Sequence, residues 1–311
     1  MKLSRKIKWI LLKFISVFSV VRGYNIAVVV LAQYLSAIFI FGSHLRAKTV
    51  LLDGHLLLII LSSSLAIASG YIINNFYDDE KDLINRPYKS LLDRKISKAT
   101  KFKIYFLLNF LSVGLAAFVS RRAAAFYAVY IFLLWIYSHK LKKYPIIGNL
   151  SASFLVLLPF FGILMHFENF SAGIFTHAFY LYLIVLIREF VKDLENIKGD
   201  FANNYQTIPV RFGLKASKNL IGSLVFLTLV PAYGLISYFE IGYMEYYFYL
   251  SSGLLIAFLV FLYPSTTQAE FTKLHILLKL IIFLGVLSIV LINPRVIIHG
   301  KQLVQPLISM L

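Results

Sequence analysis

The sequence predicts an all-α, polytopic membrane protein, and three observations support that class. Of the 311 residues, 59% are hydrophobic and only 14% are charged, whereas about a quarter of the residues in soluble domains are charged. The mean hydropathy is +0.79. Apolar runs of roughly 20 residues, long enough to cross a bilayer, recur along the chain. We therefore expect about nine transmembrane helices in a bundle around a central apolar cavity.

The first expected element is a basic helix that lies along the membrane surface. Its basic side chains are Lys2, Arg5, Lys6, Lys8 and Lys13. A lysine interrupts the apolar stretch and no small-residue cleavage site follows it, so the segment fits an interfacial helix better than a cleaved signal. We therefore divide the chain into an interfacial helix, residues 1–24, and a single transmembrane domain, residues 25–311.

The apolar runs that follow give the expected order of the spans. They cover residues 25–43, 52–76, 102–120, 123–139, 146–167, 172–191, 218–239, 245–263 and 274–293. With the N-terminus in the cytoplasm, most Lys and Arg residues fall in cytoplasmic segments, as the positive-inside rule requires. The opposite side holds Arg46, Lys48, Arg121, Arg122, Arg295 and Lys301. Lys279 is left inside the last span.

An acidic cluster, the first acidic motif (residues 74–87), follows the second span directly. If the helix continues into it, Asn74 or Asn75, Asp78 and Asp82 are three or four residues apart and share one face. Carboxylates stacked in this way repel each other, and coordination of a hard divalent cation reduces the repulsion. Mg²⁺ held by one or two carboxylates usually takes its remaining ligands from phosphate oxygens and water.

A second acidic motif (residues 188–200) follows the sixth span. It repeats the spacing of the first with an offset of 118 residues, so that Asp193, Asn196 and Asp200 correspond to Asn75, Asp78 and Asp82. Two such motifs in the two halves of a membrane protein indicate an internal repeat whose halves face one another. Both motifs fall on the cytoplasmic side of the predicted topology. Together they are suited to hold a metal-bridged diphosphate.

Composition also excludes several classes of function. The chain has no cysteine, which rules out disulfides, thiolate nucleophiles and Cys-ligated zinc or iron–sulfur sites. The net charge of +17 is assigned to topology and to anionic membrane lipids, because no nucleic-acid recognition motif accompanies it. We therefore expect no nucleic-acid partner. The sequence gives no indication of the oligomeric state.

The first acidic motif resembles the Asn-Asp-x-x-Asp-x-x-x-Asp element, followed by Asn-Arg-Pro, of the UbiA superfamily of intramembrane prenyltransferases. Asn85, Arg86 and Pro87 supply the tail of that element. The second motif is similar to the family's other aspartate-rich motif. Asn75 and Asn196 stand where the family usually has Asp, and an amide oxygen coordinates Mg²⁺ without contributing charge.

The resemblance implies a role for each of these residues. As metal ligands it implies Asp78, Asp82, Asp193 and Asp200, which are the catalytic candidates, and more weakly Asn75 and Asn196. Further family-like elements are the Arg-x-x-Asn pair before the first span and the Tyr-Ser-His-Lys-Leu-Lys stretch before Gly148. From these and the motifs, the implied substrate-binding residues are Arg22, Asn25, Asn74, Arg86, Lys142 and Lys192.

The implied reaction is Mg²⁺-assisted ionisation of an isoprenyl diphosphate donor, followed by capture of the allylic cation by a lipophilic acceptor. The second motif is similar to the branch that transfers a geranylgeranyl group to geranylgeranylglyceryl phosphate in ether-lipid synthesis. Prenylation of an aromatic quinone precursor, of the 4-hydroxybenzoate or dihydroxynaphthoate type, is the closest alternative. Chlorophyll and haem prenylation are further alternatives within the family.

A cation-coupled transporter is the main alternative from another class of function, because duplicated halves and buried carboxylates also suit transport. That interpretation predicts carboxylates near the middle of the bilayer. In this sequence they stand at helix ends beside basic loops, which suits a diphosphate better than a bare cation. A purely structural membrane protein is a third alternative.

Overall fold

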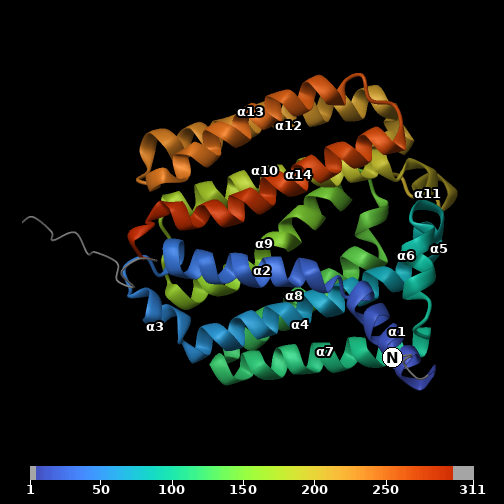
Figure 1. Cartoon of the computed structure of the whole chain (residues 1–311), viewed down its shortest axis with the longest axis horizontal. Helices are drawn as coiled ribbons and strands as arrows, with labels where there is room; N and C mark the ends of the chain where they lie inside the picture. Colours follow the sequence, from blue (N-terminus) through green and yellow to red (C-terminus); the bar gives the residue numbers. More distant parts are fainter. Residues whose placement is uncertain (1–4, 297–311) are drawn as a thin grey trace, which may run out of the picture.

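The computed structural model describes residues 5–296, with side chains from residue 12 onward. Within that range every regular element is a helix. Lys301, which was counted above in the distribution of Lys and Arg, lies outside the described residues. The end of the 25–311 domain also lies outside them. Figure 1 shows long helices lying roughly parallel to one another, with short helices gathered at one end of the bundle.

The prediction of about nine membrane-spanning helices is confirmed, because nine helical segments within residues 5–296 are long and apolar enough to cross a bilayer. They are α2 with a π-helical end (Gly23–Phe41), α4 (Gly54–Tyr77), α7 (Lys98–Val119), α8 with a 3₁₀ end (Arg121–Lys143), α9 (Ile147–Phe167), α10 (Ala172–Glu195), α12 (Ile208–Tyr238), α13 with a 3₁₀ start (Gly242–Leu262) and α14 with a 3₁₀ end (Gln268–Ile292).

Two of these helices begin more than five residues earlier than the sequence predicted. The seventh was expected from residue 218 and starts at Ile208, and the ninth was expected from residue 274 and starts at Gln268. The added residues, 208–217 and 268–273, include charged side chains such as Arg211 and Glu270, so an apolar run alone does not reveal them. Gly213, with φ 81° and ψ 175°, interrupts the helical backbone of α12 five residues before the predicted start of that span. The left-handed φ explains why glycine stands there.

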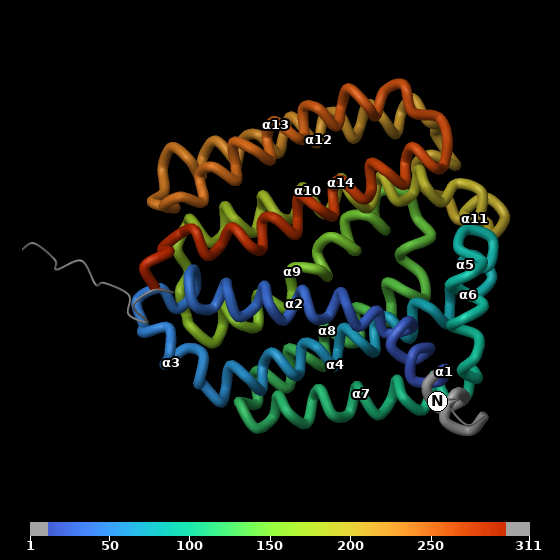
Figure 2. Tube along the Cα trace, in the orientation of Figure 1, coloured from blue at the N-terminus to red at the C-terminus, as the bar shows by residue number. Residues whose placement is uncertain are grey.

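The spans form two packed groups that share a central space. In the first group α4 packs against α7 and α8, and in the second α10 packs against α12 and α14. Helices α2 and α9 connect the groups, since α2 contacts both α4 and α14 and α9 contacts both α8 and α10. The tube view shows α10 and α14 side by side, with α2 next to α14 (Figure 2). The motif-bearing helices, α4 and α10, are therefore the central helices of their groups.

A proline in the middle of α9 is compensated by a neighbouring helix. Pro159 has no N–H, so the carbonyl of Leu155, four residues earlier, lacks its helical donor. The hydroxyl of Tyr130, on α8, donates to that carbonyl at 3.3 Å. Gln33, on α2, donates to the carbonyl of Pro159 itself at 3.1 Å. These bonds satisfy backbone groups that lipid could not.

Short helices cover the end of the bundle where α4 and α10 finish. These are α5 (Asp79–Asn85), α6 (Pro87–Asp93) and α11 (Ile197–Ala202), while α3 (Ala47–Leu51) lies at the opposite end (Figure 1). Helix α5 packs against α11, and the backbone N–H of Gly199 donates to Oδ1 of Asn85 at 3.1 Å. The segments that follow the two acidic helices are therefore in direct contact.

The N-terminal helix α1 (Arg5–Val20) packs against α6, α2 and α4 near the same end. Its Ser19 hydroxyl donates to Asp93 of α6 at 2.7 Å. The assignment of residues 1–24 as an interfacial helix stays a prediction.

Candidate active site

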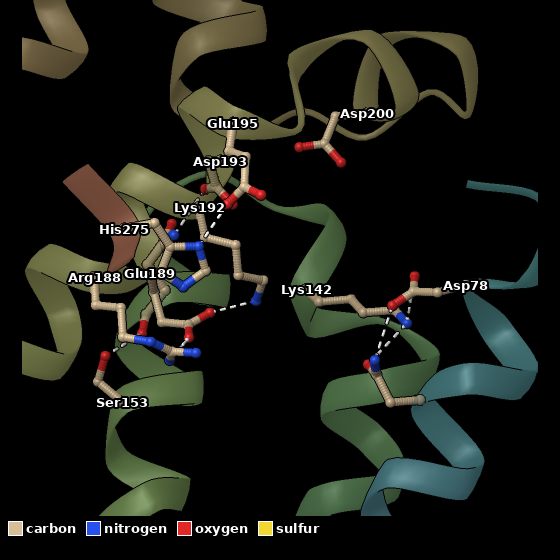
Figure 3. Close-up of polar contacts among 12 residues, drawn as sticks. Asp78, Lys142, Ser153, Arg188, Glu189, Lys192, Asp193, Glu195, Asp200 and His275 are labelled. Atoms are coloured by element: carbon tan, nitrogen blue, oxygen red, sulfur yellow. Dashed lines mark hydrogen bonds and ion pairs between the residues drawn. The ribbon is translucent and has the colours of Figure 1, made fainter. Parts of the chain in front are cut away.

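The first acidic motif lies where α4 ends. Asp78 is the C-cap residue of α4 and immediately precedes α5. Because four residues make about one helical turn, the side chain of Asn74 lies under Asp78 and donates to its carboxylate at 2.9 Å. Lys142, from the end of the α8 segment, bonds to both residues, at 2.8 Å to Asp78 and 3.2 Å to Asn74 (Figure 3).

Asp78 is buried, with 7% of its surface exposed. The hydroxyl of Tyr205 donates at 2.9 Å to Oδ1, the oxygen that also pairs with Lys142. Burial alone would raise the pKa of Asp78, but the charges of Lys142 and Lys81 outweigh that effect and hold the pKa well below its usual range. Asp78 is therefore a stable carboxylate at neutral pH.

The second acidic motif lies at the junction of α10 and α11. Asp193 is in the last turn of α10, where Asn149 of α9 donates to it at 2.8 Å. Asn196 is the buried residue between the two helices. Asp200, on α11, is completely buried and pairs with Lys81 at 2.6 Å. Figure 3 shows the Asp200 carboxylate directed toward the space that separates α10 from Asp78.

Lys81 links the two motifs although it belongs to the first. Its ammonium group pairs with Asp200 and stacks on the ring of Tyr205 at 4.3 Å from the centroid. Burial lowers the pKa of Lys81, but the charges of Asp78 and Asp200 more than reverse this, and the pKa ends above its usual value. Asp200 is less well compensated, because burial raises its pKa and Lys81 offsets only part of that rise.

Asp78 and Asp200 are therefore on the same side of the bundle. Lys81 pairs with Asp200 and its charge also acts on Asp78, while Tyr205 donates its hydroxyl to Asp78 and its backbone N–H to the carbonyl oxygen of Asp200. Asp82, on α5, is half-buried beside them. Burial and the charge of Asp78 raise the pKa of Asp82, although Arg22 and Arg86 act in the opposite direction. The structure thus brings Asp78, Asp82, Asp193 and Asp200 to one end of the bundle.

Asn75 is placed differently from the other candidates. Its amide nitrogen donates to Asp93 at 3.1 Å, and its oxygen accepts from Lys101 at 2.7 Å. Both partners lie on the α6–α7 side of α4. Of the two asparagines that the helical spacing left open, Asn74 is therefore the one that faces Asp78, and Asn75 is removed from the candidate ligands.

Arg22 and Asn25 meet α4 through a residue that the sequence did not single out. The guanidinium of Arg22 stacks over the ring of Tyr71 at 5.0 Å, and Asn25 donates to its hydroxyl at 3.3 Å. Arg22 has φ 51°, an uncommon left-handed conformation for a non-glycine residue. The charges of Asp82 and Asp78 act on Arg22, so it borders the first acidic motif.

The two remaining substrate-binding candidates are paired with glutamates of α10. Arg86 pairs with Glu195 at 3.5 Å, and His275 of α14 binds the other oxygen of that carboxylate. Lys192 and Arg188 both pair with Glu189, reaching it from two sides (Figure 3). Arg188 and Lys192 of the second motif thus pair with Glu189 of the same motif. Lys142 and Lys81 pair instead with Asp78 and Asp200.

The donor set fits Mg²⁺ bound jointly with a diphosphate. Among residues 5–296 no three His, Cys, Asp or Glu side chains gather closely enough to hold a metal ion by themselves. Mg²⁺ does not need such a cage, because one or two carboxylates and phosphate oxygens suffice. Asp78, Asp82, Asp193 and Asp200 supply only hard oxygen ligands, and lysines stand beside two of them. These residues therefore suit a magnesium diphosphate better than a bare cation.

An apolar pocket occupies the interior beyond this site. It measures about 940 Å³ with its open mouth included and lies between α2, α9, α10, α13 and α14. Its lining includes His177 and Tyr180 in the first half of α10. His177 precedes Asp193 by 16 residues, which is about 24 Å along a helix. The pocket thus lies toward the end of the bundle opposite the acidic residues.

Comparison with known proteins gives the family of the chain. Residues 34–280 match the model of the UbiA prenyltransferase family. The chain belongs to this family. It is therefore an integral, multi-pass membrane prenyltransferase, and the resemblance to the UbiA superfamily is confirmed.

Several curated relatives of this UbiA protein carry the same name. The chain is 29% identical over 261 residues, 80% of its own length and 90% of the relative's, to a digeranylgeranylglyceryl phosphate synthase of Korarchaeum cryptofilum. It is also 29% identical over 271 residues, 86% of its length and 95% of the relative's, to the protein of that name from Thermococcus gammatolerans.

Solved structures share the fold. One comes from work on digeranylgeranylglyceryl phosphate synthase in membranes, with a TM-score of 0.67, 23% identity, and coverage of 90% of this chain and 98% of that one. Another is a UbiA homolog from Archaeoglobus fulgidus bound to GPP and Mg²⁺, with a TM-score of 0.62, 16% identity, and coverage of 88% and 99%. Divalent metal and isoprenyl diphosphate thus bind to a protein of this fold.

Several residues at the site were not predicted from the sequence. Lys81 lies inside the first motif, and its spacing from Asp78 gave a signal that was not used. Asn149 directly follows Gly148, beside a family-like stretch, but was not singled out. Tyr205 gave no local signal, because its contact with Asp78 spans 127 residues of chain.

Proposed function

We propose that this UbiA-family prenyltransferase transfers a geranylgeranyl group from geranylgeranyl diphosphate to geranylgeranylglyceryl phosphate, forming an ether lipid. The observation that carries the proposal is the convergence of two acidic motifs on one lysine, Lys81, above an apolar pocket. The names of the curated relatives support the choice of acceptor. The cytoplasmic position of the site, inferred from the distribution of Lys and Arg, is part of the proposal.

The donor diphosphate is proposed to bind between the two motifs. Mg²⁺, when bound, would neutralise charge on the diphosphate, with Asp78, Asp82, Asp193 and Asp200 as its ligands and Asn196 as a weaker one. When the diphosphate binds, Lys81 and Lys142 contact its phosphate oxygens in place of the carboxylate oxygens of Asp200 and Asp78. Arg22 and Arg86 border the same space, and Asn74 and Asn25 orient neighbouring groups by hydrogen bonds.

The prenyl chain is proposed to extend from this site into the apolar pocket. Cleavage of the allylic C–O bond leaves the electron pair on the diphosphate, where the basic side chains stabilise it. The acceptor hydroxyl then forms the new C–O bond with the allylic carbon and releases its proton. Aromatic pocket residues such as Phe160, Phe161 and Tyr180 would surround the apolar end of that chain.

The two alternatives remain distinguishable by experiment. An aromatic quinone precursor has no phosphate, so its site needs less positive charge than the α10–α14 side of this protein provides. A cation-coupled transporter is disfavoured because the carboxylates stand at the ends of α4 and α10, beside basic residues, instead of near the middle of the spans.

The test is transfer of labelled geranylgeranyl diphosphate by the purified protein. The acceptors are geranylgeranylglyceryl phosphate, 4-hydroxybenzoate and dihydroxynaphthoate, each with Mg²⁺ or with EDTA. The proposal expects a labelled ether product with the first acceptor only, and none with EDTA. A prenylated aromatic product would show that the acceptor is an aromatic quinone precursor. Cation flux in liposomes without any prenyl transfer would refute the proposed enzymatic function.

A further inference from the structure

Lys279 is a charged residue in the middle of a membrane-spanning helix and has no ion-pair or hydrogen-bond partner among the described residues. It lies 11 residues after the start of α14, which is about 16 Å into the helix. A lysine at that depth is costly in lipid unless it faces a polar space or a counter-ion. A counter-ion near the ammonium group of Lys279 would offset that cost.

The surroundings of Lys279 identify the side of α14 on which its charge lies. The charged groups within electrostatic range of it are Arg188 of α10, Arg86 after α5, Glu195 of α10 and Arg22 before α2. Lys279 follows His275 by four residues, about one helical turn, and His275 contacts Glu195 of α10, so both residues lie on the side of α14 that faces α10. Lys279 therefore faces the shared space between α2, α10 and α14.

Positive charge exceeds negative charge on this side of the site. Glu189 is paired with both Arg188 and Lys192. Glu195 is paired with Arg86 and accepts a hydrogen bond from His275. Glu189 and Glu195 thus supply two negative charges on this side. The cationic side chains are four: Arg188, Lys192, Arg86 and Lys279. The guanidinium of Arg188 uses one nitrogen for Glu189 and keeps further donors for an anion.

Helix register places Arg188 and Lys279 at similar depth. The contact between Glu195 and His275 aligns α10 with the antiparallel α14. From that level Lys279 is one turn deeper, about 6 Å, and Arg188 is seven residues deeper, about 10 Å. Asp193 is only two residues, about 3 Å, below Glu195. The two cations therefore lie on the membrane side of the acidic ligands.

We propose that Arg188 and Lys279 form a second anion site, which binds the phosphate of the acceptor lipid. This inference rests on the proposed function. The tail of the donor points into the membrane, so its reacting carbon lies deeper than its diphosphate. An acceptor hydroxyl that reaches this carbon, with a phosphate a few bonds away, brings that phosphate to the depth of Arg188 and Lys279. Lys142 is assigned to the donor diphosphate, and Lys192 stays paired with Glu189.

The decisive measurement combines a protein change with removal of the acceptor's phosphate. We compare wild type, Lys279→Met, Lys279→Arg and Arg188→Gln with geranylgeranylglyceryl phosphate and with geranylgeranylglycerol, which has no phosphate. In Lys279→Met we expect KM for the phosphorylated acceptor to rise roughly tenfold or more. KM for the donor should stay within about twofold, and Lys279→Arg should restore most of the acceptor affinity. With the phosphate-free acceptor the variants and wild type should be equally slow.

Lys273→Met is the matched control, because Lys273 is an exposed lysine of the same helix six residues nearer its start. It should leave both KM values unchanged. If Lys279→Met raises the acceptor KM equally with and without the phosphate, the inference is overturned while the proposed function stands. If wild type transfers nothing to the phosphorylated acceptor but prenylates an aromatic one, the proposed function fails first.

An anionic lipid headgroup is the other possible source of a phosphate at this site. The same assays in vesicles of phosphatidylcholine alone and of phosphatidylcholine with phosphatidylglycerol distinguish the two sources. The inference expects the acceptor KM of wild type to rise only modestly, by competition, when phosphatidylglycerol is added. If wild type is active only when phosphatidylglycerol is present, and Lys279→Met loses that activity, the site binds the lipid headgroup and the inference is overturned.

Discussion

The two acidic motifs occupy matching positions at the ends of α4 and α10, but different groups neutralise their aspartates. In the first motif Asp78 is bound by Lys142, Tyr205 and Asn74 together. In the second motif Asp200 has one cation, Lys81, and Asp193 has a neutral amide. Both lysines come from the first half of the chain. The comparison shows that two sequence copies supply the acids, whereas one half supplies the cations for both.

The largest effect should follow removal of Lys81. Lys81→Met leaves the fully buried Asp200 without a cation, and breaking a buried ion pair in this way costs about 3–5 kcal/mol. The free energy of unfolding in detergent measures this loss. Lys142→Met should cost less, because Tyr205 and Asn74 still donate to Asp78. The double variant Lys81→Met/Asp200→Asn should recover most of the loss, and no recovery would contradict the pairing.

Neutralising the acids should affect transfer itself. Asp78→Asn and Asp200→Asn should each lower kcat/KM by roughly 10²–10³-fold, the effect of removing one electrostatic group from an active site. Steady-state transfer at several Mg²⁺ concentrations measures it. Asp79→Asn is the control, since Asp79 pairs with Arg94 outside the site. Unchanged activity in both active-site variants would disprove the assignment of these ligands.

The contact between the segments after the two motifs can be tested by adding one methyl group. A Cβ at Gly199 would lie 2.3 Å from Nδ2 of Asn85, and overpacking of this kind costs about 1–3 kcal/mol. Gly199→Ala should therefore lower both thermal stability and transfer rate. Gly253→Ala, where nothing lies within 4 Å, should be neutral or slightly stabilising. Equal behaviour of the two variants would argue against a close contact.

The smallest effect is expected at the far end of α4, away from both motifs. Asp53 accepts from the N–H groups of His55 and Leu56 and contacts His166. Asp53→Ala should lower stability by about 1 kcal/mol, the usual value of an N-cap, without changing transfer. A transfer rate that falls with it would show that the two ends of α4 are coupled.

The stabilisation by Asp53 should also depend on pH. Burial acts to raise the pKa of Asp53, but the hydrogen bonds from His166 and the backbone outweigh it, so the pKa lies below the ordinary value of 3.8. A lowered pKa means that the contribution is complete above about pH 4 and is lost as the pH falls through the folded-state pKa. The difference in Tm between wild type and Asp53→Ala should therefore shrink below pH 4. A constant difference would contradict the assigned partners.

The spans were predictable because hydrophobicity in a membrane protein is a local property of the chain. The first residues of α12 and α14 were missed for the same reason, since charged side chains such as Arg211 and Glu270 place them outside the apolar runs. At the site, helical spacing correctly placed Asn74 and Asp78 on one face. It could not choose between Asn74 and Asn75, because the choice depends on Asp93 and Lys101, which come from other helices.

Contacts between distant segments were the least predictable part of the site. Lys142 reaches Asp78 across 64 residues and Tyr205 reaches it across 127. A short basic loop gives the same sequence signal whether its lysines bind an aspartate or face solvent. Only the packing of α4 against α8 and of α5 against α11 decides which lysine is buried.

The proline of α9 bears on how this protein is made. While the chain is being synthesised, a helix with a free carbonyl at its centre enters lipid at a disadvantage. The hydroxyl of Tyr130 that satisfies this carbonyl belongs to α8, the preceding span, and Gln33 belongs to the first. Both donors precede Pro159 in the chain and are therefore synthesised before it. The order of the helices along the chain thus allows each helix to pack against donors that are already present.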